Sequence, residues 1–209
     1  MFCRILKGKK FAGLAVIMLL AIVPQWTMAS TSNPLAVIQS GTDRALQIIR
    51  ASHKGDAPSL RQRRSELLTI VDEYFDFEGM GKTALGRPWK EQSPENRQEF
   101  VKLFKQLLFN TYISRIEKLS GTKEKAYYDS EKFQGDYALV KTHMDLESEQ
   151  NVSLDYRFHL ENGQWKVYDV VVEGVSLVEN YRSQFASILT GGTFDVLLQK
   201  LREKVEQQG

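Results

Sequence analysis

Serine, histidine and carboxylate side chains in the second half of the sequence are the residues that could perform chemistry. Gly174-Val175-Ser176 begins like the turn that carries the nucleophile of serine hydrolases, but Val178 stands where that turn needs a second glycine. Ser176 with Glu179 three residues later fits a capping box, in which each side chain bonds a free backbone N–H at the start of a helix. The sequence therefore predicts a helix start at Ser176 rather than a nucleophile.

The histidines make a weak case for a metal site. His143 and Asp145 are two residues apart on an expected strand and share a face, and His159 lies on the polar side of a neighbouring strand. A zinc site needs at least three protein ligands, and nothing at ligand spacing completes this set. We therefore expect these side chains to be solvated, and we predict no metal site and no cofactor.

No other pattern in the sequence is typical of an enzyme. The single cysteine, Cys3, lies in an N-terminal segment that we expect to be removed, which excludes thiol chemistry in the remaining chain. Glycine-rich loops that bind phosphate or a dinucleotide are absent from the sequence. Asp169 is the one acid embedded among apolar neighbours, the setting that a general acid or base for an apolar substrate would need.

The elements that position these residues include helices, which are expected in the first half of the chain and at its end. Apolar residues at helical spacing predict helices over 33–50, 59–75 and 76–85, then from Ser93 onward, from Ser176 to the Gly191-Gly192 pair, and over 194–205. The helix after Ser93 is the clearest, because Pro94 suits its first position and one row of apolar side chains runs along it. That row consists of Phe100, Phe104, Leu108, Tyr112 and Ile116.

Strands are expected where the apolar period changes to two. Alternation predicts strands over 137–146, 152–161 and 164–172, and Asn162-Gly163 is typical of a two-residue hairpin turn. The run Val170-Val171-Val172 indicates burial on both faces. Hairpin-linked strands with helices grouped before and after them predict an α+β fold, with an antiparallel twisted sheet that carries helices on one face.

The N-terminus has the pattern of a cleavable signal peptide over residues 1–29, which leaves 30–209 as a single domain. The apolar run 11–23 is shorter than the roughly 20 residues of a membrane anchor, which is the alternative. The leader carries four of the 28 basic residues, so 24 remain against 26 acidic ones. The remaining chain therefore lacks the excess of basic residues that is typical of nucleic-acid binding. Its features are Arg4, Lys7, Lys9 and Lys10, then the apolar run, Pro24, and Thr27-Met28-Ala29 before the expected cleavage site.

Several short motifs, in order along the chain, resemble the MlaC family, which is also called the toluene-tolerance or ABC-transporter auxiliary family. Each motif is weak alone, but together they span about residues 33 to 205. The motifs are Phe75-Asp76-Phe77, Ala84-Leu85-Gly86 followed by Trp89, residues 100–108, Thr111-Tyr112, Trp165, Tyr168-Asp169-Val170, Glu173-Gly174-Val175-Ser176, and Asn180-Tyr181-Arg182-Ser183-Gln184-Phe185.

The resemblance implies a periplasmic carrier without catalytic residues. Such a protein shuttles glycerophospholipid between an outer-membrane lipoprotein complex and an inner-membrane ABC transporter, and so maintains the lipid asymmetry of the outer membrane. The implied fold is an NTF2-like sheet with helices that enclose an apolar lipid pocket, with phospholipid as cargo and no cofactor. An NTF2-like enzyme acting on a small apolar substrate, and an adaptor with a solid core, are the alternatives.

We expect the apolar strand face and helix rows to line one lipid pocket. Val175 is expected at its mouth, and Arg87 and Arg182 are candidates for contact with the lipid phosphate. The full set expected to bind lipid is Tyr74, Phe77, Phe100, Phe104, Leu108, Tyr112, Leu154, Tyr156, Phe158, Val171, Val175, Tyr181, Phe185 and Ile188.

Overall fold

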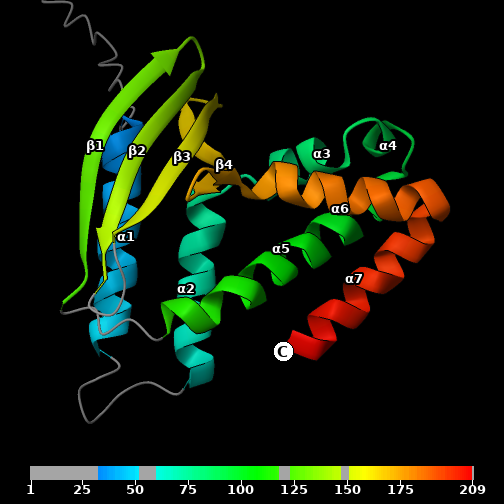
Figure 1. The fold of residues 1–209 in the computed structure, drawn as a ribbon, viewed down its shortest axis with the longest axis horizontal. Helices are drawn as coiled ribbons and strands as arrows, with labels where there is room; N and C mark the ends of the chain where they lie inside the picture. Colours follow the sequence, from blue (N-terminus) through cyan, green and yellow to red (C-terminus); the bar gives the residue numbers. More distant parts are fainter. Residues whose placement is uncertain (1–32, 52–59, 118–122, 147–150, 209) are drawn as a thin grey trace, which may run out of the picture. The chain divides into compact units, whose positions relative to one another are not determined.

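A five-stranded antiparallel sheet in the order β1-β2-β3-β4-β5 positions most of the candidate residues. The computed structural model describes residues 33–51, 60–117, 123–146 and 151–208, which all belong to one compact unit. The expected signal peptide lies outside the described residues. Figure 1 shows the elements, which are α1 (Pro34–Ala51), α2 (Leu60–Tyr74), α3 (Phe77–Leu85), α4 (Arg87–Lys90), α5 (Pro94–Ile116), β1 (Lys125–Gln134), β2 (Tyr137–Asp145), β3 (Val152–Glu161), β4 (Gln164–Val172), β5 (Val175–Ser176), α6 (Leu177–Gly191) and α7 (Phe194–Gln208).

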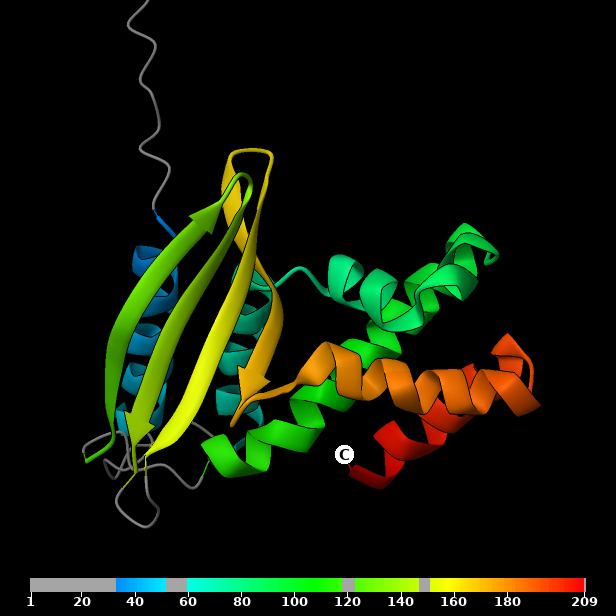
Figure 2. The same cartoon turned by 45° about the horizontal axis from the view of Figure 1, so that its top comes forward.

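The sheet has one apolar face, set by the register of its strands. Residues directly opposite each other in an antiparallel pair point to the same side. Val140 of β2 lies opposite Tyr156 of β3, which lies opposite Val170 of β4. Helix α1 packs against β1, β2 and β4, and α2 packs against α1 and β4, so these two helices cover the apolar face (Figures 1 and 2). The α+β fold with helices on one face of an antiparallel sheet is confirmed.

Helices α3 to α7 pack mainly on one another. Helix α5 contacts α3 and α7, α3 contacts α6, and α6 reaches back to β4. The caps expected from the sequence are present, since Ser93 accepts a hydrogen bond from the N–H of Asn96 and Ser176 accepts one from the N–H of Glu179. The short α4 was not expected, because Gly86 and Pro88 end the preceding helical pattern.

The turn between β3 and β4 also has the expected conformation. Both central residues have positive φ, 49° at Asn162 and 78° at Gly163, as a type I′ turn requires. Strand β1 was missed, because it is rich in charged residues and its register shifts between Tyr128 and Ser130. That irregularity interrupts the alternation on which strand prediction depends.

The buried side chains form two clusters. The sheet cluster lies between the apolar face and α1, and its buried members are Val37, Ile38, Ala138, Val140, Phe158, Val167 and Val170. The helical cluster joins α3 to α7, and its buried members are Met80, Ala84, Leu85, Trp89, Phe100, Leu103, Phe104, Leu107, Leu108, Val178, Tyr181, Phe185, Phe194, Leu197, Leu198 and Leu201.

Candidate functional site

Tyr156 is the distinctive residue of the apolar sheet face. Its side chain is only partly buried, and it packs against the sheet cluster beside Leu154 and Val172. Burial nevertheless raises the pKa of Tyr156 to about 12, with the neighbouring Tyr128 acting in the same direction. The surroundings of the phenol are therefore far less polar than water, although its surface is not fully covered.

The helical cluster is filled by aromatic contacts among its own members. Phe100 and Phe104 have no exposed surface. The ring of Phe185 meets the Phe100 ring edge-on with centroids 5.4 Å apart, and Tyr181 meets Phe104 edge-on at 5.3 Å. These are favourable aromatic geometries. Phe100, Phe104 and Leu108 of the predicted helix row are therefore buried, with other aromatic rings as their partners, whereas Tyr112 and Ile116 are only partly buried.

The structure divides the residues expected to bind lipid between the two clusters. Val171 lies on the opposite face of β4 from Val170, and Val175 is 57% exposed. The lipid-binding role of the whole set remains a prediction. The helical cluster or its border holds Phe77, Phe100, Phe104, Leu108, Tyr112, Tyr181, Phe185 and Ile188, and the sheet cluster or its border holds Tyr74, Leu154, Tyr156 and Phe158.

Phe75, Asp76 and Phe77 form the joint between the clusters. Phe75 packs against both, and its ring stacks on that of Phe77 with centroids 5.9 Å apart. The backbone N–H of Asp76 donates to the carbonyl of Val167 on β4, while the Asp76 carboxylate caps α3 by accepting from the N–H of Gly79 at 2.8 Å. This motif therefore fixes the start of α3 to the edge of the sheet.

Asp169 is a second connection between the sheet and the helices. Its side chain is almost fully buried and accepts hydrogen bonds from Ser176 Oγ at 2.7 Å, from the N–H of Val178 at 3.1 Å and from Arg157 at 2.9 Å. Ser176 in turn caps α6. Because these donors occupy both carboxylate oxygens, Asp169 serves as an anchor for the start of α6.

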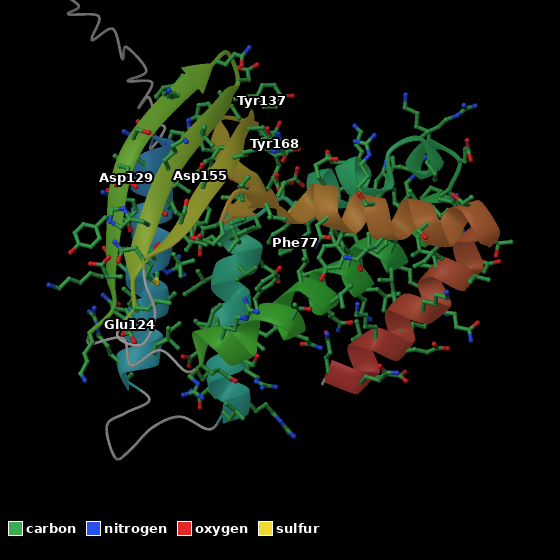
Figure 3. The ribbon with its side chains drawn as sticks, viewed as in Figure 1. Phe77, Glu124, Asp129, Tyr137, Asp155 and Tyr168 are labelled. Carbon is green, nitrogen blue, oxygen red and sulfur yellow. The ribbon has the colours of Figure 1, made fainter. Side chains whose placement is uncertain are left out.

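The two histidines of the sheet lie beside separate carboxylates. His143 lies 2.9 Å from Asp129 of β1, which is labelled in Figure 3. His159 lies 2.9 Å from Asp76. In the β2–β3 register His143 pairs with Ser153 while Tyr137 pairs with His159, which separates the histidines by about 20 Å along the strands. They do not form one site.

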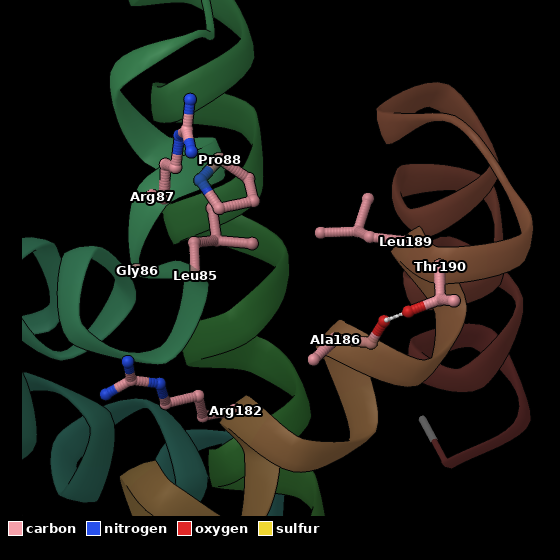
Figure 4. Close-up of a pocket in the computed structure, with 8 residues that line it drawn as sticks. All are labelled: Leu85, Gly86, Arg87, Pro88, Arg182, Ala186, Leu189 and Thr190. Carbon is pink, nitrogen blue, oxygen red and sulfur yellow. Dashed lines mark hydrogen bonds between the residues drawn. The ribbon is translucent and has the colours of Figure 1, made fainter.

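A surface groove of about 350 Å³ runs between α3, α4 and α6 (Figure 4). Leu85, Pro88 and Leu189 give it apolar walls, and both candidate phosphate ligands, Arg87 and Arg182, border it. Arg87 lies 3.6 Å from Glu91, and Arg182 lies 3.5 Å from Glu179, in exposed ion pairs. The structure thus brings the two arginines to one groove, and their contact with lipid phosphate remains a prediction.

Comparison with known proteins identifies the family. The sequence matches the family described as MlaC protein over residues 39–203, which is most of the chain. The chain belongs to the MlaC family. Within the described residues, the helices of this MlaC protein include none that is long and apolar enough to cross a membrane.

Individual relatives are similar over nearly the whole chain. The intermembrane phospholipid transport system binding protein MlaC of Haemophilus influenzae is 26% identical over 213 residues, covering 98% of this chain and 97% of its own. The toluene tolerance protein ttg2D of Pseudomonas putida is 25% identical over 180 residues, covering 83% and 80%. The solved phospholipid-binding protein of Ralstonia solanacearum, in complex with a phospholipid, is 28% identical, has a TM-score of 0.75, and covers 85% of this chain and 99% of its own.

Sequence reasoning missed the long-range partners in this MlaC protein. Asp169 was singled out as a buried acid, but its bonds to Arg157 and Val178 depend on sheet pairing and on the start of α6. The proximity of Asp76 to His159 was missed, because nothing near either residue in the sequence points to the other. The helix cap at Ser176 was found, since a capping box is a local pattern.

Proposed function

We propose that this MlaC protein is a periplasmic phospholipid carrier and not an enzyme. The acyl chains occupy the border of the sheet cluster around Tyr156, and the headgroup faces water. The observation that carries this proposal is the apolar border of the sheet cluster, where Leu154, Tyr156 and Val172 pack against the core yet are only partly buried. Side chains that line an apolar recess have both properties.

The border between the clusters supplies suitable surroundings for acyl chains. Leu154, Tyr156, Val172 and Leu177 are partly buried at the edge of the sheet cluster, and Phe75 joins this border to the helices. Burying acyl chains is worth roughly 0.8 kcal/mol per methylene, so two chains of ordinary length supply on the order of 20 kcal/mol towards extraction from a bilayer. The apolar lining suffices for binding, and no charged group is needed inside.

We further infer that the carrier moves lipid between an outer-membrane lipoprotein complex and an inner-membrane ABC transporter, and so helps to maintain outer-membrane lipid asymmetry. The name of the Haemophilus influenzae relative, an intermembrane phospholipid transport system binding protein, supports this role. The proposed signal peptide over residues 1–29 supports a place in the periplasm.

An enzymatic role receives little support from the candidate residues. Ser176 caps α6 and donates to Asp169, whose oxygens also accept from Arg157 and Val178. A serine hydrolase that used Ser176 as nucleophile and Asp169 as the acid of a catalytic triad would need a histidine within hydrogen-bond reach of the serine. His159 lies beside Asp76 instead. We therefore propose that lipid enters and leaves the protein intact.

Native mass spectrometry of the protein purified from cells tests the carrier proposal. We expect bound phospholipid in the wild-type protein and its loss in Leu154→Trp, because the larger ring fills the space beside Tyr156. Val196→Trp is the matched control, since Val196 is 38% exposed on α7 and should retain wild-type lipid occupancy. Full occupancy in a folded Leu154→Trp protein would contradict the proposed location, and lipid-free wild-type protein would favour the adaptor.

The fate of the lipid tests whether the protein is an enzyme. Loaded protein is incubated with membranes that contain the transporter, and the lipid products are separated by chromatography. We expect intact phospholipid in the membranes, with the headgroup and both chains still joined. Lysophospholipid or free fatty acid that disappears in Ser176→Ala would contradict the carrier and indicate a lipase.

A further inference from the structure

Asp76, His159 and Glu161 gather on the face of the sheet opposite the sheet cluster. His159 and Glu161 are two residues apart on β3, so their side chains leave the strand on the same side. Asp76 comes from the joint before α3. One potential ligand atom from each residue lies within 4.8 Å of the others, and no other such group of three or more occurs among the described residues.

The ring nitrogen of His159 that faces this group is unsatisfied. Its Nε2 atom is buried and lies 2.9 Å from Oδ2 of Asp76, yet no hydrogen bond of acceptable geometry forms with any described group. A protonated imidazole that paired with the carboxylate would direct its N–H at the oxygen. A separation of 2.9 Å without that alignment places two possible ligands side by side, and a small rotation gives the roughly 3.3 Å between neighbouring ligands of a tetrahedral zinc ion.

The charge around the group also favours a cation. The nearest basic side chains on the same sheet have other partners, since Lys166 donates to the carbonyl of Glu73 and Arg157 to Asp169. In the ion pairs between described residues, neither Asp76 nor Glu161 is paired with lysine or arginine. Two carboxylates therefore face one imidazole, and no ion pair between described residues joins either carboxylate to a lysine or arginine.

We propose that Asp76, His159 and Glu161 bind one divalent first-row transition metal ion. One imidazole and two carboxylates are ligands of the type that zinc accepts, with water free to complete the shell. Neighbouring ligands of a tetrahedral zinc ion lie about 3.3–3.6 Å apart, and the exposed Glu161 side chain can rotate to bring its carboxylate from within 4.8 Å to that separation. Oδ1 of Asp76 caps α3, which leaves Oδ2 for the metal and holds the carboxylate in place.

The bound ion would fasten the end of β3 to the start of α3. That connection reinforces the joint at Phe75 and Phe77, where the sheet cluster meets the helical cluster. The site lies on the other face of the sheet from Tyr156, because His159 and Tyr156 alternate along β3. The ion is therefore independent of the lipid proposal and can be tested on protein with or without lipid.

Calorimetric titration with zinc chloride tests the site, with tag-free full-chain protein that has first been treated with a chelator. We expect one zinc ion per chain and a rise in melting temperature on zinc addition, because an ion that binds the folded state stabilises it. Magnesium and calcium should bind at least about tenfold more weakly, since imidazole favours transition metals. His159→Asn should remove the binding and the rise in melting temperature.

The other histidines provide the matched control. The chain has three histidines, and the double variant His53→Asn with His143→Asn removes the two that lie outside the proposed site. We expect this variant to bind zinc like the wild type. Glu161→Gln, at an exposed position, should weaken binding at least about tenfold without affecting folding. Absence of zinc binding, binding that persists in both His159→Asn and Glu161→Gln, or loss in the double variant alone would overturn the proposal.

Discussion

Replacing Asp169 should lower the free energy of unfolding without affecting lipid binding. Asp169→Ala deprives the Ser176 hydroxyl and the buried N–H of Val178 of their acceptor, and it leaves Arg157 without its partner. A hydrogen bond to a buried charge contributes about 1.5–3 kcal/mol, whereas an ion pair with a side chain as exposed as that of Arg157 adds less than about 1 kcal/mol. The expected loss in free energy of unfolding is therefore about 3–5 kcal/mol.

Urea denaturation followed by circular dichroism measures this loss. Asp169→Asn keeps an acceptor for Val178 and should lose only about 1–2 kcal/mol, because the charge is removed but the neutral hydrogen bonds can form. Asp155→Asn is the control on the same sheet face, since Asp155 has one ion pair, to the half-exposed Lys141, and should lose less than about 1 kcal/mol. Equal losses of unfolding free energy in Asp169→Ala and Asp155→Asn would refute the role of Asp169 as an anchor. Loss of lipid binding in a folded Asp169→Asn protein would instead show that Asp169 takes a direct part in binding.

Three further predictions concern the Tyr156 phenol, the groove bordered by Arg87 and Arg182, and the expected mouth of the lipid pocket at Val175. Burial raises the pKa of Tyr156 to about 12, so above about pH 10 this phenol stays neutral in the folded protein but ionises in the unfolded chain. The free energy of unfolding should therefore fall by up to about 2–3 kcal/mol between pH 10 and pH 12. Tyr156→Phe should lack this part of the loss when its alkaline denaturation is measured. The double variant Arg87→Gln with Arg182→Gln should retain anionic phospholipid less well than neutral phospholipid in lipid extracts, and equal retention of both would exclude a phosphate contact at the groove. Val175→Glu should fold, because the position is 57% exposed, but should lose lipid if the mouth lies there, so wild-type occupancy would exclude Val175 from the mouth.

Features that depend on neighbouring residues were predictable from the sequence. Ser93 and Ser176 were identified as helix caps, and Asn162-Gly163 as a tight turn, because each pattern reports a local backbone geometry. The apolar row that begins at Phe100 follows from helical periodicity alone. Strand β1 was the main omission, since its irregularity at Tyr128 breaks the period of two that marks a strand.

Features that depend on sheet pairing and element packing were not predictable in the same way. The apolar strand face and the apolar helix row looked equally suitable for one pocket, yet they lie in separate clusters. Periodicity shows that a face is buried but not which face covers it. The same reason hid the group formed by Asp76, His159 and Glu161, whose members meet only when α3 begins beside β4.

The division into two clusters also bears on how a carrier can release its cargo. The aromatic rings of the helical cluster are buried by packing on one another. The residues that would change their exposure are the partly buried ones at the border, around Leu154 and Tyr156. Lipid leaving the proposed site at this border would leave both clusters closed and would avoid the cost of exposing them, about 25 cal/mol per Å² of apolar surface. The polar connections at Asp76 and Asp169 join the sheet to the helices, so the proposed loading and release would not require either cluster to unfold.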